Sequence, residues 1–523
     1  MRHSLEVLSV LAGLIFGGSS LLAQSVDKGP LVPPKTSNLW AEIQVVDAAT
    51  GEGVPLVELE TVNGLKFVTD NAGRVAFHEP GLMGKTVFFF VRSHGYEIPK
   101  DGFGMAGVRI IPTVGKPAKI KIKRQMLAER LCRLTGEGLY RDTLLLGYER
   151  PIPKSKNPGR VAGQDSVQAI VSRNKVYWFW GDTNRMEYPL GLFRVAGATT
   201  SVPDPKEAQS DPAHGISFDY FTNKKTGFVR AMMPYPERPK GVVWVESIFV
   251  VRDDKGRKRL LGHYSRRQSL AKEYEQGIAI FNDDTAIFES AKRLPLEEGW
   301  RRPSGHPIVY REKGVEWLLF GSPHPNVRVR ATLADVLDPT KYEAFMCGKA
   351  TEPDLDKEGK PLWRWQKKWP PTDSQTESRW IKAGKLKPEY ARFCLTDASK
   401  PGTRVVLHRG SIRWNSYRKR WVLVAGQIGG KRSFLGEVWY AEAKHPTGPF
   451  SKAVQIVTHD KQTFYNVCHH GFYDRDEGRT IHFEGTYTNM FSGNPIKTPR
   501  YNYNQILYRL DLGAKPLKAA FVN

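Results

Sequence analysis

Asp165 and Asp182 are placed so that they could act as a catalytic pair. They flank a predicted hairpin, QDSVQAIV/KVYWFWGDT, with a tight turn at Arg173-Asn174. Facing residues of an antiparallel hairpin have numbers that add to twice the midpoint of the turn, and this arithmetic pairs the two aspartates. Directly opposed residues hold their Cβ atoms ~5 Å apart, so one carboxyl group should stay protonated beside the other. One protonated and one ionised carboxyl group is the requirement of glycoside hydrolysis. A simple turn-capping role for either aspartate is the structural alternative.

The same arithmetic predicts two further facing pairs of ionisable residues. In VESIFVVR/RKRLLGHYS it sets Glu246 opposite His263, and in CHHGFYD/RTIHFEGTYT it sets His469 opposite Glu484. Each pair lies at the same end of its hairpin as the two aspartates. A cross-strand ion pair or a buried polar network would explain them equally well.

A rim of candidate site residues follows from these pairs. Asp165 and Asp182 are the predicted catalytic residues, with Glu246 as the second candidate for the acid. A separation of ~5 Å between the carboxyl groups predicts retention of anomeric configuration, whereas a wider pair formed with Glu246 predicts inversion. The predicted substrate-binding residues are His263, His306, Arg409, His469, His470 and Glu484.

Five hairpins of this kind predict an all-β fold, a five-bladed β-propeller over residues 140–513. Aromatic residues make up 11% of the chain, which also contains 48 Gly and 35 Pro, and such a composition favours short strands joined by tight turns. Units of about four strands repeated around a ring are typical of propellers. A charged insertion over residues 350–402 interrupts the series. The final strand, 504–512, is expected to close the ring with help from residues 142–148.

The N-terminal part of the chain predicts export and a second, smaller domain. Residues 1–23 have a basic start, a short apolar core and Ala23 at a cleavage site, which is typical of a signal peptide and predicts a periplasmic or secreted protein. No segment has the ~20 apolar residues of an integral membrane helix. Residues 24–38 are predicted to form a linker, and the alternating runs in residues 39–125 predict a small antiparallel β-sandwich.

Charge and cysteine content restrict the partners. The formal net charge is +24, with Lys and Arg spread along the chain and no nucleic-acid-binding motif. An acidic polysaccharide is therefore one predicted partner, and a merely basic surface is the alternative; a monomer is expected. Four separated cysteines predict no metal site of zinc-type spacing. A Cys347–Cys394 disulfide and free thiols both stay open. No cofactor is predicted, although a structural calcium ion in the channel is allowed.

Two stretches of sequence resemble known families. VVDAATGEGVPLVELE followed by FVTDNAGRVAF resembles the carboxypeptidase-regulatory, transthyretin-like module. GQDS, VYWFWGDTN, GEVWYAEAKHPTGPF and FYNVCHHGFYDRDEGRTIHFEGTYT resemble five-bladed propeller glycosidases, namely the propeller group linked to endo-D-arabinan cleavage and, more distantly, glycoside hydrolase family 43. The first group implies catalysis by early aspartates that match Asp165 and Asp182. Family 43 implies that Asp165 is the base and Glu246 a candidate acid.

Three functions remain open at this point. The first is a secreted glycoside hydrolase acting on a polysaccharide. The second is a polysaccharide lyase acting on an acidic glycan through His, Tyr and Arg side chains, with these candidates: His306, His324, Arg409, Tyr465, His469 and His470. The third is a non-catalytic glycan-binding protein.

Overall fold

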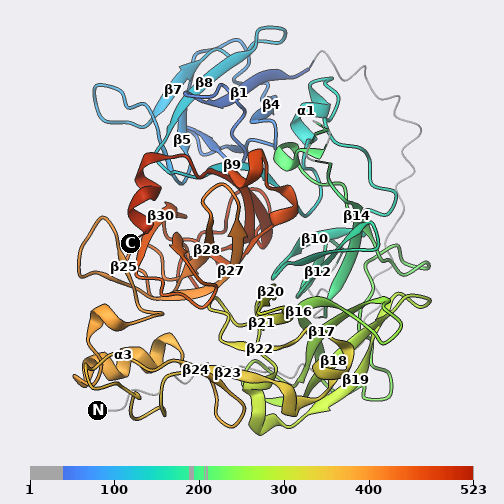
Figure 1. Cartoon of the computed structure of the whole chain (residues 1–523). Helices are drawn as coiled ribbons and strands as arrows, with labels where there is room; N and C mark the ends of the chain where they lie inside the picture. Colours follow the sequence, from blue (N-terminus) through green and yellow to red (C-terminus); the bar gives the residue numbers. More distant parts are fainter. Residues whose placement is uncertain (1–38, 188–193, 205, 208–209, 522–523) are drawn as a thin grey trace, which may run out of the picture.

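The computed structural model describes residues 39–187, 194–204, 206–207 and 210–521. A sandwich domain lies against one side of a ring of β-sheets (Figure 1). The predicted signal peptide and linker, residues 1–38, are outside the described residues. Within the described part of the chain, no helix is both long and apolar enough to span a bilayer.

The N-terminal domain is a sandwich of two four-stranded sheets. One sheet has the order β4-β1-β8-β6, with these bounds: β1 (Ala41–Asp47), β4 (Arg74–Phe77), β6 (Tyr96–Glu97) and β8 (Ala118–Arg124). The other has the order β3-β2-β5-β7: β2 (Glu58–Thr61), β3 (Lys66–Val68), β5 (Val87–Arg92) and β7 (Gly107–Ile110). All strand pairs are antiparallel except β1 with β8, which is parallel. The prediction of a purely antiparallel sandwich is wrong in this one pair.

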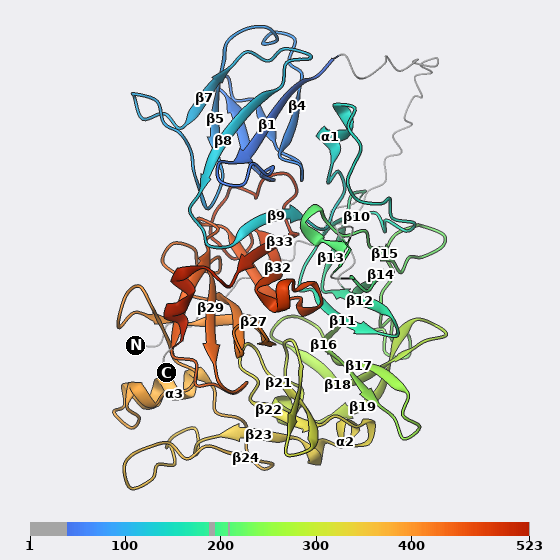
Figure 2. The same ribbon diagram turned by 45° about the horizontal axis from the view of Figure 1, so that its top comes forward.

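The rest of the chain forms five blades, which confirms the predicted propeller (Figure 2). Blade 1 contains β11 (Gln168–Ser172), β12 (Lys175–Trp180), β14 (Ala196–Ser201) and β15 (Asp219–Tyr220). Blade 2 contains β16 (Val242–Arg252), β17 (Lys258–Arg267), β18 (Glu273–Asn282) and β19 (Ile287–Leu294). Blade 3 contains β20 (Ile308–Glu312), β21 (Val315–Phe320), β22 (Val327–Arg330), β23 (Glu343–Met346) and β24 (Arg364–Gln366).

Blades 4 and 5 complete the ring. Blade 4 contains β27 (Leu407–Asn415), β28 (Arg420–Gln427), β29 (Val438–Ala443) and β30 (Lys452–Val457). Blade 5 contains β31 (Thr463–His469), β32 (Thr480–Thr488), β33 (Asn504–Asp511) and β9 (Glu129–Arg133). Neighbouring blades meet along their first strands, as β11 does with β16 and β27 with β31.

The ring is closed by β9, not by residues 142–148. β9 pairs with β33, so the blade formed by the end of the chain receives its outer strand from residues before 140. Residues 141–145 instead form the helix α1 (Arg141–Leu145). The predicted closure is wrong because a single strand paired across more than 370 positions of sequence leaves no local signal.

The charged insertion bridges blades 3 and 4. It contains β24, α3 (Ser374–Lys382) and β25 (Leu395–Asp397), and β25 extends blade 4 with β26 (Arg404–Val405). The Cys347 thiol donates to the carbonyl of Asp354 and the Cys394 thiol to that of Ser374. All four cysteines are free, so of the two possibilities that the sequence left open for Cys347 and Cys394 the structure has the free thiols.

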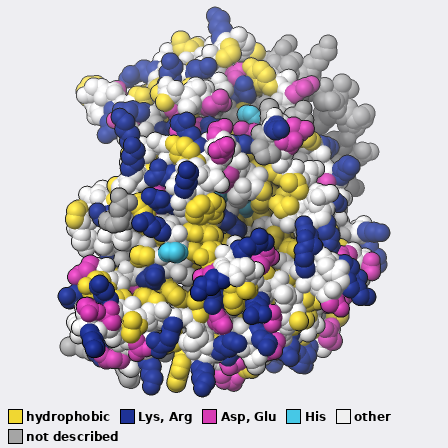
Figure 3. All heavy atoms as spheres, viewed as in Figure 1, with side chains coloured by type: hydrophobic (Ala, Val, Ile, Leu, Met, Phe, Trp, Pro, Cys, Tyr) yellow, Lys and Arg dark blue, Asp and Glu magenta, His cyan; other side chains and the backbone are white. Residues whose placement is uncertain are grey.

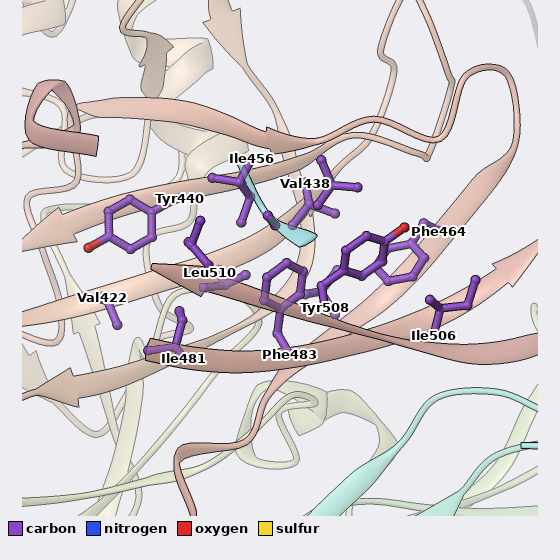
Figure 4. Close-up of a cluster of buried hydrophobic side chains, with 14 of the residues drawn as sticks. Val422, Val438, Tyr440, Ile456, Phe464, Ile481, Phe483, Ile506, Tyr508 and Leu510 are labelled. Carbon is purple, nitrogen blue, oxygen red and sulfur yellow. The ribbon is translucent and has the colours of Figure 1, made fainter. Parts of the chain in front are cut away.

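The largest apolar core lies between blades 4 and 5. Figure 4 shows side chains from neighbouring blades packed together, among them Tyr440, Phe464, Phe483 and Tyr508. Alternation along the strands places these side chains on the inner faces of the blades. Phe483 stacks on Tyr508 with a centroid distance of 5.6 Å. This packing holds rigid the strands that carry the polar end of the ring.

The sandwich is attached to the ring-closing strand by buried polar contacts. The Asn71 side chain accepts a hydrogen bond from the Arg133 backbone N–H (3.0 Å) and donates one to its carbonyl (2.9 Å). Asp70 and Asp142 accept backbone N–H groups of α1 and β4, respectively. The sandwich therefore stabilises the closure of the ring directly.

Candidate active site

Asp165 and Asp182 face each other at one end of blade 1. The Asp165 backbone N–H donates to the Asp182 carbonyl (3.2 Å), and the Gly181 N–H donates to the Asp165 carbonyl (2.7 Å). The hairpin register between them is the predicted one, since Gln168 faces Phe179 and the intervening turn has positive φ at Arg173 and Asn174. The structure thus brings the two predicted catalytic residues together.

The two carboxyl groups have unequal surroundings. Burial raises the pKa of Asp165, against the lowering influence of hydroxyl groups from Tyr465, Tyr503 and Ser166. The Tyr465 hydroxyl donates to Asp165 Oδ2 at 2.7 Å. Burial and then the charge of Asp165 raise the pKa of Asp182 to about 6, although Trp244 donates a hydrogen bond to it. Asp165 thus receives more donors, and the proton of the pair belongs on Asp182.

Glu246 lies in a different environment because it is paired with two arginines. Arg302 donates to its Oε1 at 3.1 Å and Arg409 to its Oε2 at 3.0 Å. Burial acts to raise the pKa of Glu246, but the charges of Arg409 and Arg302 outweigh it and leave the pKa below its ordinary value. Glu246 is therefore ionised at neutral pH, and it is a poor proton donor.

Strand β16 connects the aspartate pair to this arginine cluster. Trp244 and Glu246 are two positions apart and point to the same face of the strand. The Trp244 Nε1 donates to Asp182 Oδ1 at 2.9 Å. Trp244 and Glu246 lie ~7 Å apart along the strand, at ~3.3 Å per residue, so β16 contacts both the aspartate pair and the arginine cluster.

The inner strands are interrupted at this end of the ring. The pairing register shifts just after Glu246 in blade 2 and just after Tyr465 in blade 5, and in blade 1 the chain leaves the strand at Asp165. The next residue has positive φ in all three blades: Ser166 (57°), Ser247 (53°) and Asn466 (54°). Such bulges re-aim side chains and the strain in them is typical of functional sites.

A sequence signal accompanies these interruptions and would have located them. In blades 1, 2, 4 and 5 a glycine lies in the second strand or directly after it, opposite an interruption of the first strand: Gly181, Gly262, Gly426 and Gly485. Gly321 directly follows the second strand of blade 3. A Cβ atom at Gly181 would lie 2.3 Å from Asp165 Oδ1, so the catalytic geometry needs glycine there. Such a glycine is visible in all five hairpin sequences, and it lies in each blade at the level of the site.

Four predicted substrate-binding residues are buried and cannot touch a substrate in this conformation. They are at most 1% exposed: His263, His469, His470 and Glu484. His263 does face Glu246 across the strands as predicted, but its Nδ1 is bonded to the Pro303 carbonyl at 2.9 Å. In this structure the four residues pack inside the blades, and their role in substrate binding stays a prediction.

The predicted pairing of His469 with Glu484 is wrong. Glu484 faces Cys468, and His469 faces Phe483. The arithmetic fails because the connection contains two turns, Gly471–Tyr473 and Asp476–Gly478, rather than one tight turn. The Glu484 carboxyl instead bonds His470 Nε2 at 2.6 Å.

Of the rim residues, Arg409 and His306 remain partly accessible. The Arg409 side chain is 37% exposed. Half-buried His306 lies beside Cys468, with 3.5 Å between Nδ1 and Sγ, and burial lowers the pKa of His306 to about 3. In the described ranges, no group of three or more His, Cys, Asp or Glu side chains is arranged to hold a metal ion. A structural calcium ion in the channel stays a prediction.

Three cavities elsewhere do not include the aspartates. Their volumes are about 270, 310 and 710 Å³, and they lie between the sandwich and blade 4, beside residues 134–161, and at the turns of blades 1 and 2. Lys and Arg side chains are spread over the face shown in Figure 3 rather than gathered in one patch. The site is therefore identified by its side chains and not by the size of a cavity.

No protein-family model and no curated protein matches the chain. Its similarities are to solved structures. One is an α-L-arabinofuranosidase from Fusarium graminearum, at 10% identity over 74% of this chain and 98% of that one, with a TM-score of 0.35. Another is an α-L-arabinanase from Cellvibrio cellulosa, at 11% identity over 67% and 92%, with a TM-score of 0.33.

A third similar structure is a thermostable glycoside hydrolase of family 43, at 9% identity over 68% of this chain and 92% of that one, with a TM-score of 0.29. The predicted distant likeness to family 43 is thus found among solved structures. The resemblance of the sandwich to carboxypeptidase-regulatory modules stays a prediction.

Proposed function

We propose that this protein hydrolyses glycosidic bonds in a polysaccharide, using Asp165 and Asp182 as its catalytic pair. The observation that carries the proposal is the facing pair of carboxyl groups with unequal surroundings. Burial raises the pKa of both groups, but Asp165 receives several hydrogen bonds that favour its ionised form and oppose this rise, while the pKa of Asp182 is raised to about 6. Such a division between two carboxyl groups matches the needs of glycosidic cleavage.

The proposed first step uses both groups at once. Asp182 donates its proton to the leaving glycosidic oxygen as the bond from that oxygen to the anomeric carbon breaks. Asp165 forms a glycosyl ester at the anomeric carbon, so that the negative charge of its carboxylate is consumed. The ionised Asp182 then takes a proton from water, and the hydroxide displaces Asp165. We propose the retaining course because backbone hydrogen bonds hold Asp165 opposite Gly181 and Asp182, and retaining enzymes have their two carboxyl groups only ~5 Å apart.

The lyase alternative has less support. The Tyr465 hydroxyl is engaged with Asp165, and burial raises the pKa of Tyr465 far above its ordinary value. Buried His324 lies between β21 and β22 and packs against Phe393 of the insertion with a centroid distance of 4.7 Å. His469 and His470 are buried. Few of the groups that would abstract a proton are therefore within reach of a uronate.

We further propose that the substrate is acidic and that the enzyme is exported. Arg409 has one hydrogen-bond partner among the described residues, Glu246, so its other N–H groups can bind a carboxylate or sulfate of the glycan. Export, expected from residues 1–23, would bring the enzyme to extracellular polysaccharides. A mature protein beginning near Gln24 in secreted fractions would support it.

Variants of the three carboxyl residues test the proposal. Release of reducing ends from arabinan, xylan and polygalacturonate should fall by about a thousandfold in Asp165→Asn and Asp182→Asn. Glu246→Gln serves as the matched control, since it removes a carboxylate that is not assigned to the chemistry, and it should lose less. Full activity of Asp165→Asn on a confirmed substrate would refute the assignment. Ultraviolet absorbance of an unsaturated uronide in the products would show elimination instead.

A further inference from the structure

Two exposed aromatic side chains lie at the catalytic end of blades 4 and 5. Phe434 is in the β28–β29 connection and is 51% exposed, and Phe491 is in the β32–β33 connection and is 56% exposed. The ends of β28 and β32 face the starts of β27 and β31, at the end of the ring where Tyr465 lies. Both connections therefore border the aspartate pair.

A short chain of contacts links Phe491 to Asp165. The rings of Phe491 and Tyr465 meet edge to face with a centroid distance of 6.0 Å, and the Tyr465 hydroxyl donates to Asp165 at 2.7 Å. With ~2.8 Å from the tyrosine centroid to its hydroxyl, Phe491 lies at most about 12 Å from the carboxylate. That span corresponds to one or two sugar rings.

Phe434 borders the same group of residues. Its neighbour Leu435 packs in a small apolar cluster with Tyr465, Tyr503 and Ile428. The two phenylalanines thus lie on either side of this buried apolar cluster. We call Phe434 and Phe491 the aromatic ledge. Exposed apolar side chains gathered beside a polar site are typical of binding surfaces.

The backbone at Phe491 has an unfavourable conformation. Its φ is 64°, in a region that bulky residues rarely adopt, at a cost of roughly 1 to 3 kcal/mol. Side-chain hydrogen bonds fix the loop: Asn489 Nδ2 donates to the Asn494 carbonyl, Ser492 Oγ to that of Asn489, and Gln462 Nε2 to that of Ile496. The loop is thus pre-organised to present an aromatic ring to solvent.

We propose that the aromatic ledge binds a sugar ring of the polysaccharide on the blade 5 side of the cleaved bond. The C–H groups on the flat face of a sugar carry partial positive charge and are attracted to the negative face of an aromatic ring. Asp165 acts at the bond, and the ledge holds the chain one or two units away. The inference rests on the proposed function for its orientation but concerns binding rather than cleavage.

The ledge is tested by measuring polysaccharide binding in a variant that cannot hydrolyse its substrate. Asp165→Asn protein is run in native gels containing arabinan, xylan or polygalacturonate, and the apparent dissociation constant is measured from its retardation. Adding Phe491→Ala or Phe434→Ala should raise that constant about fivefold to tenfold, and Phe491→Tyr should restore binding. Phe103→Ala is the matched control, because Phe103 is 92% exposed on the sandwich.

The outcomes separate the ledge from the proposed function. Equal retardation of Phe491→Ala and its parent, or no retardation of the parent in all three gels, would overturn the ledge. Hydrolysis of the same polysaccharides by the wild-type protein is measured separately. Hydrolysis without dependence of binding on Phe491 leaves the function standing, whereas binding that depends on Phe491 without hydrolysis leaves only the ledge.

Discussion

Replacing Trp244 by Phe should shift the pH dependence of activity to higher pH. The indole N–H donates to Asp182 at 2.9 Å and stabilises its ionised form, so that its removal raises the pKa of Asp182 further. A hydrogen bond to a charged group contributes about 1.5 kcal/mol at the lower end of its range, which suits a partly exposed carboxyl and corresponds to ~1 pKa unit.

The sign of the effect depends on the role of Asp182. A general acid must be protonated, so activity falls as the pH rises through its pKa. A shift from about 6 to ~7 raises the protonated fraction at pH 7 from ~9% to ~50%. The ratio of kcat/KM between Trp244→Phe and wild type should therefore rise about fivefold between pH 6 and pH 8, whatever uniform loss the substitution causes.

The assay is the pH profile of kcat/KM on whichever of the three polysaccharides is cleaved. Trp414→Phe is the control, since Trp414 is half exposed at the far end of blade 4 and should leave the profile unchanged. A ratio that stays flat or falls with pH would refute the assignment of Asp182 as the acid. A basic limb well below pH 5 would point instead to Glu246, whose pKa is held low by arginines.

Four further results are expected. Gly181→Ala places a Cβ 2.3 Å from Asp165 Oδ1 and should lower kcat by about a hundredfold with little change in Tm. Asp182→Asn should raise Tm at pH 7, because a carboxyl group with a raised pKa destabilises the fold once it ionises. Asn71→Ala removes two buried hydrogen bonds to the ring-closing strand and should cost about 2 kcal/mol of unfolding free energy in urea titrations. Wild type should lose stability relative to His263→Gln between pH 6.5 and pH 4, because the pKa of buried His263 is lowered to about 4 and the unfolded chain binds that proton first; thermal melts of both proteins across this range would detect the loss.

The success of the hairpin arithmetic depended on turn length. It is right in blade 1 because Arg173 and Asn174 form a two-residue turn with positive φ at both positions. In blade 2 the pairs next to the turn sum to 510, which centres it on Lys255 and not between Asp254 and Lys255 as predicted. The bulge after Glu246 removes this one-residue offset, so the predicted pair with His263 is observed. The prediction nevertheless had the wrong centre for the turn and did not include the bulge.

The parts that could not be predicted are those set by tertiary contacts. Burial of His470 and Glu484 depends on how blade 5 packs, and the strands alone do not show which polar residues face inward. Of the two arginines that hold Glu246, Arg302 lies in the irregular connection between blades 2 and 3, where no periodic pattern exists. Arg409 lies in β27 and was predicted as a rim residue, but its pairing with Glu246 was not predicted. Trp244 was within reach of sequence reasoning, because it shares a strand face with Glu246.

In or beside the inner strands, several unfavourable features of the propeller lie together at one end of the ring, and this argues for function there without reference to any known enzyme. The hairpin turns at the other end also contain left-handed non-glycine residues, such as Arg173 and Asn174, but tight turns require that conformation. Three non-glycine residues with left-handed backbone, two facing carboxyl groups and an exposed phenylalanine each cost stability. The apolar packing between the blades, by contrast, follows ordinary strand alternation. A ring needed only as a scaffold could place these costs anywhere or avoid them. Their common location around Asp165 is explained if that end of the ring binds a glycan and cleaves it.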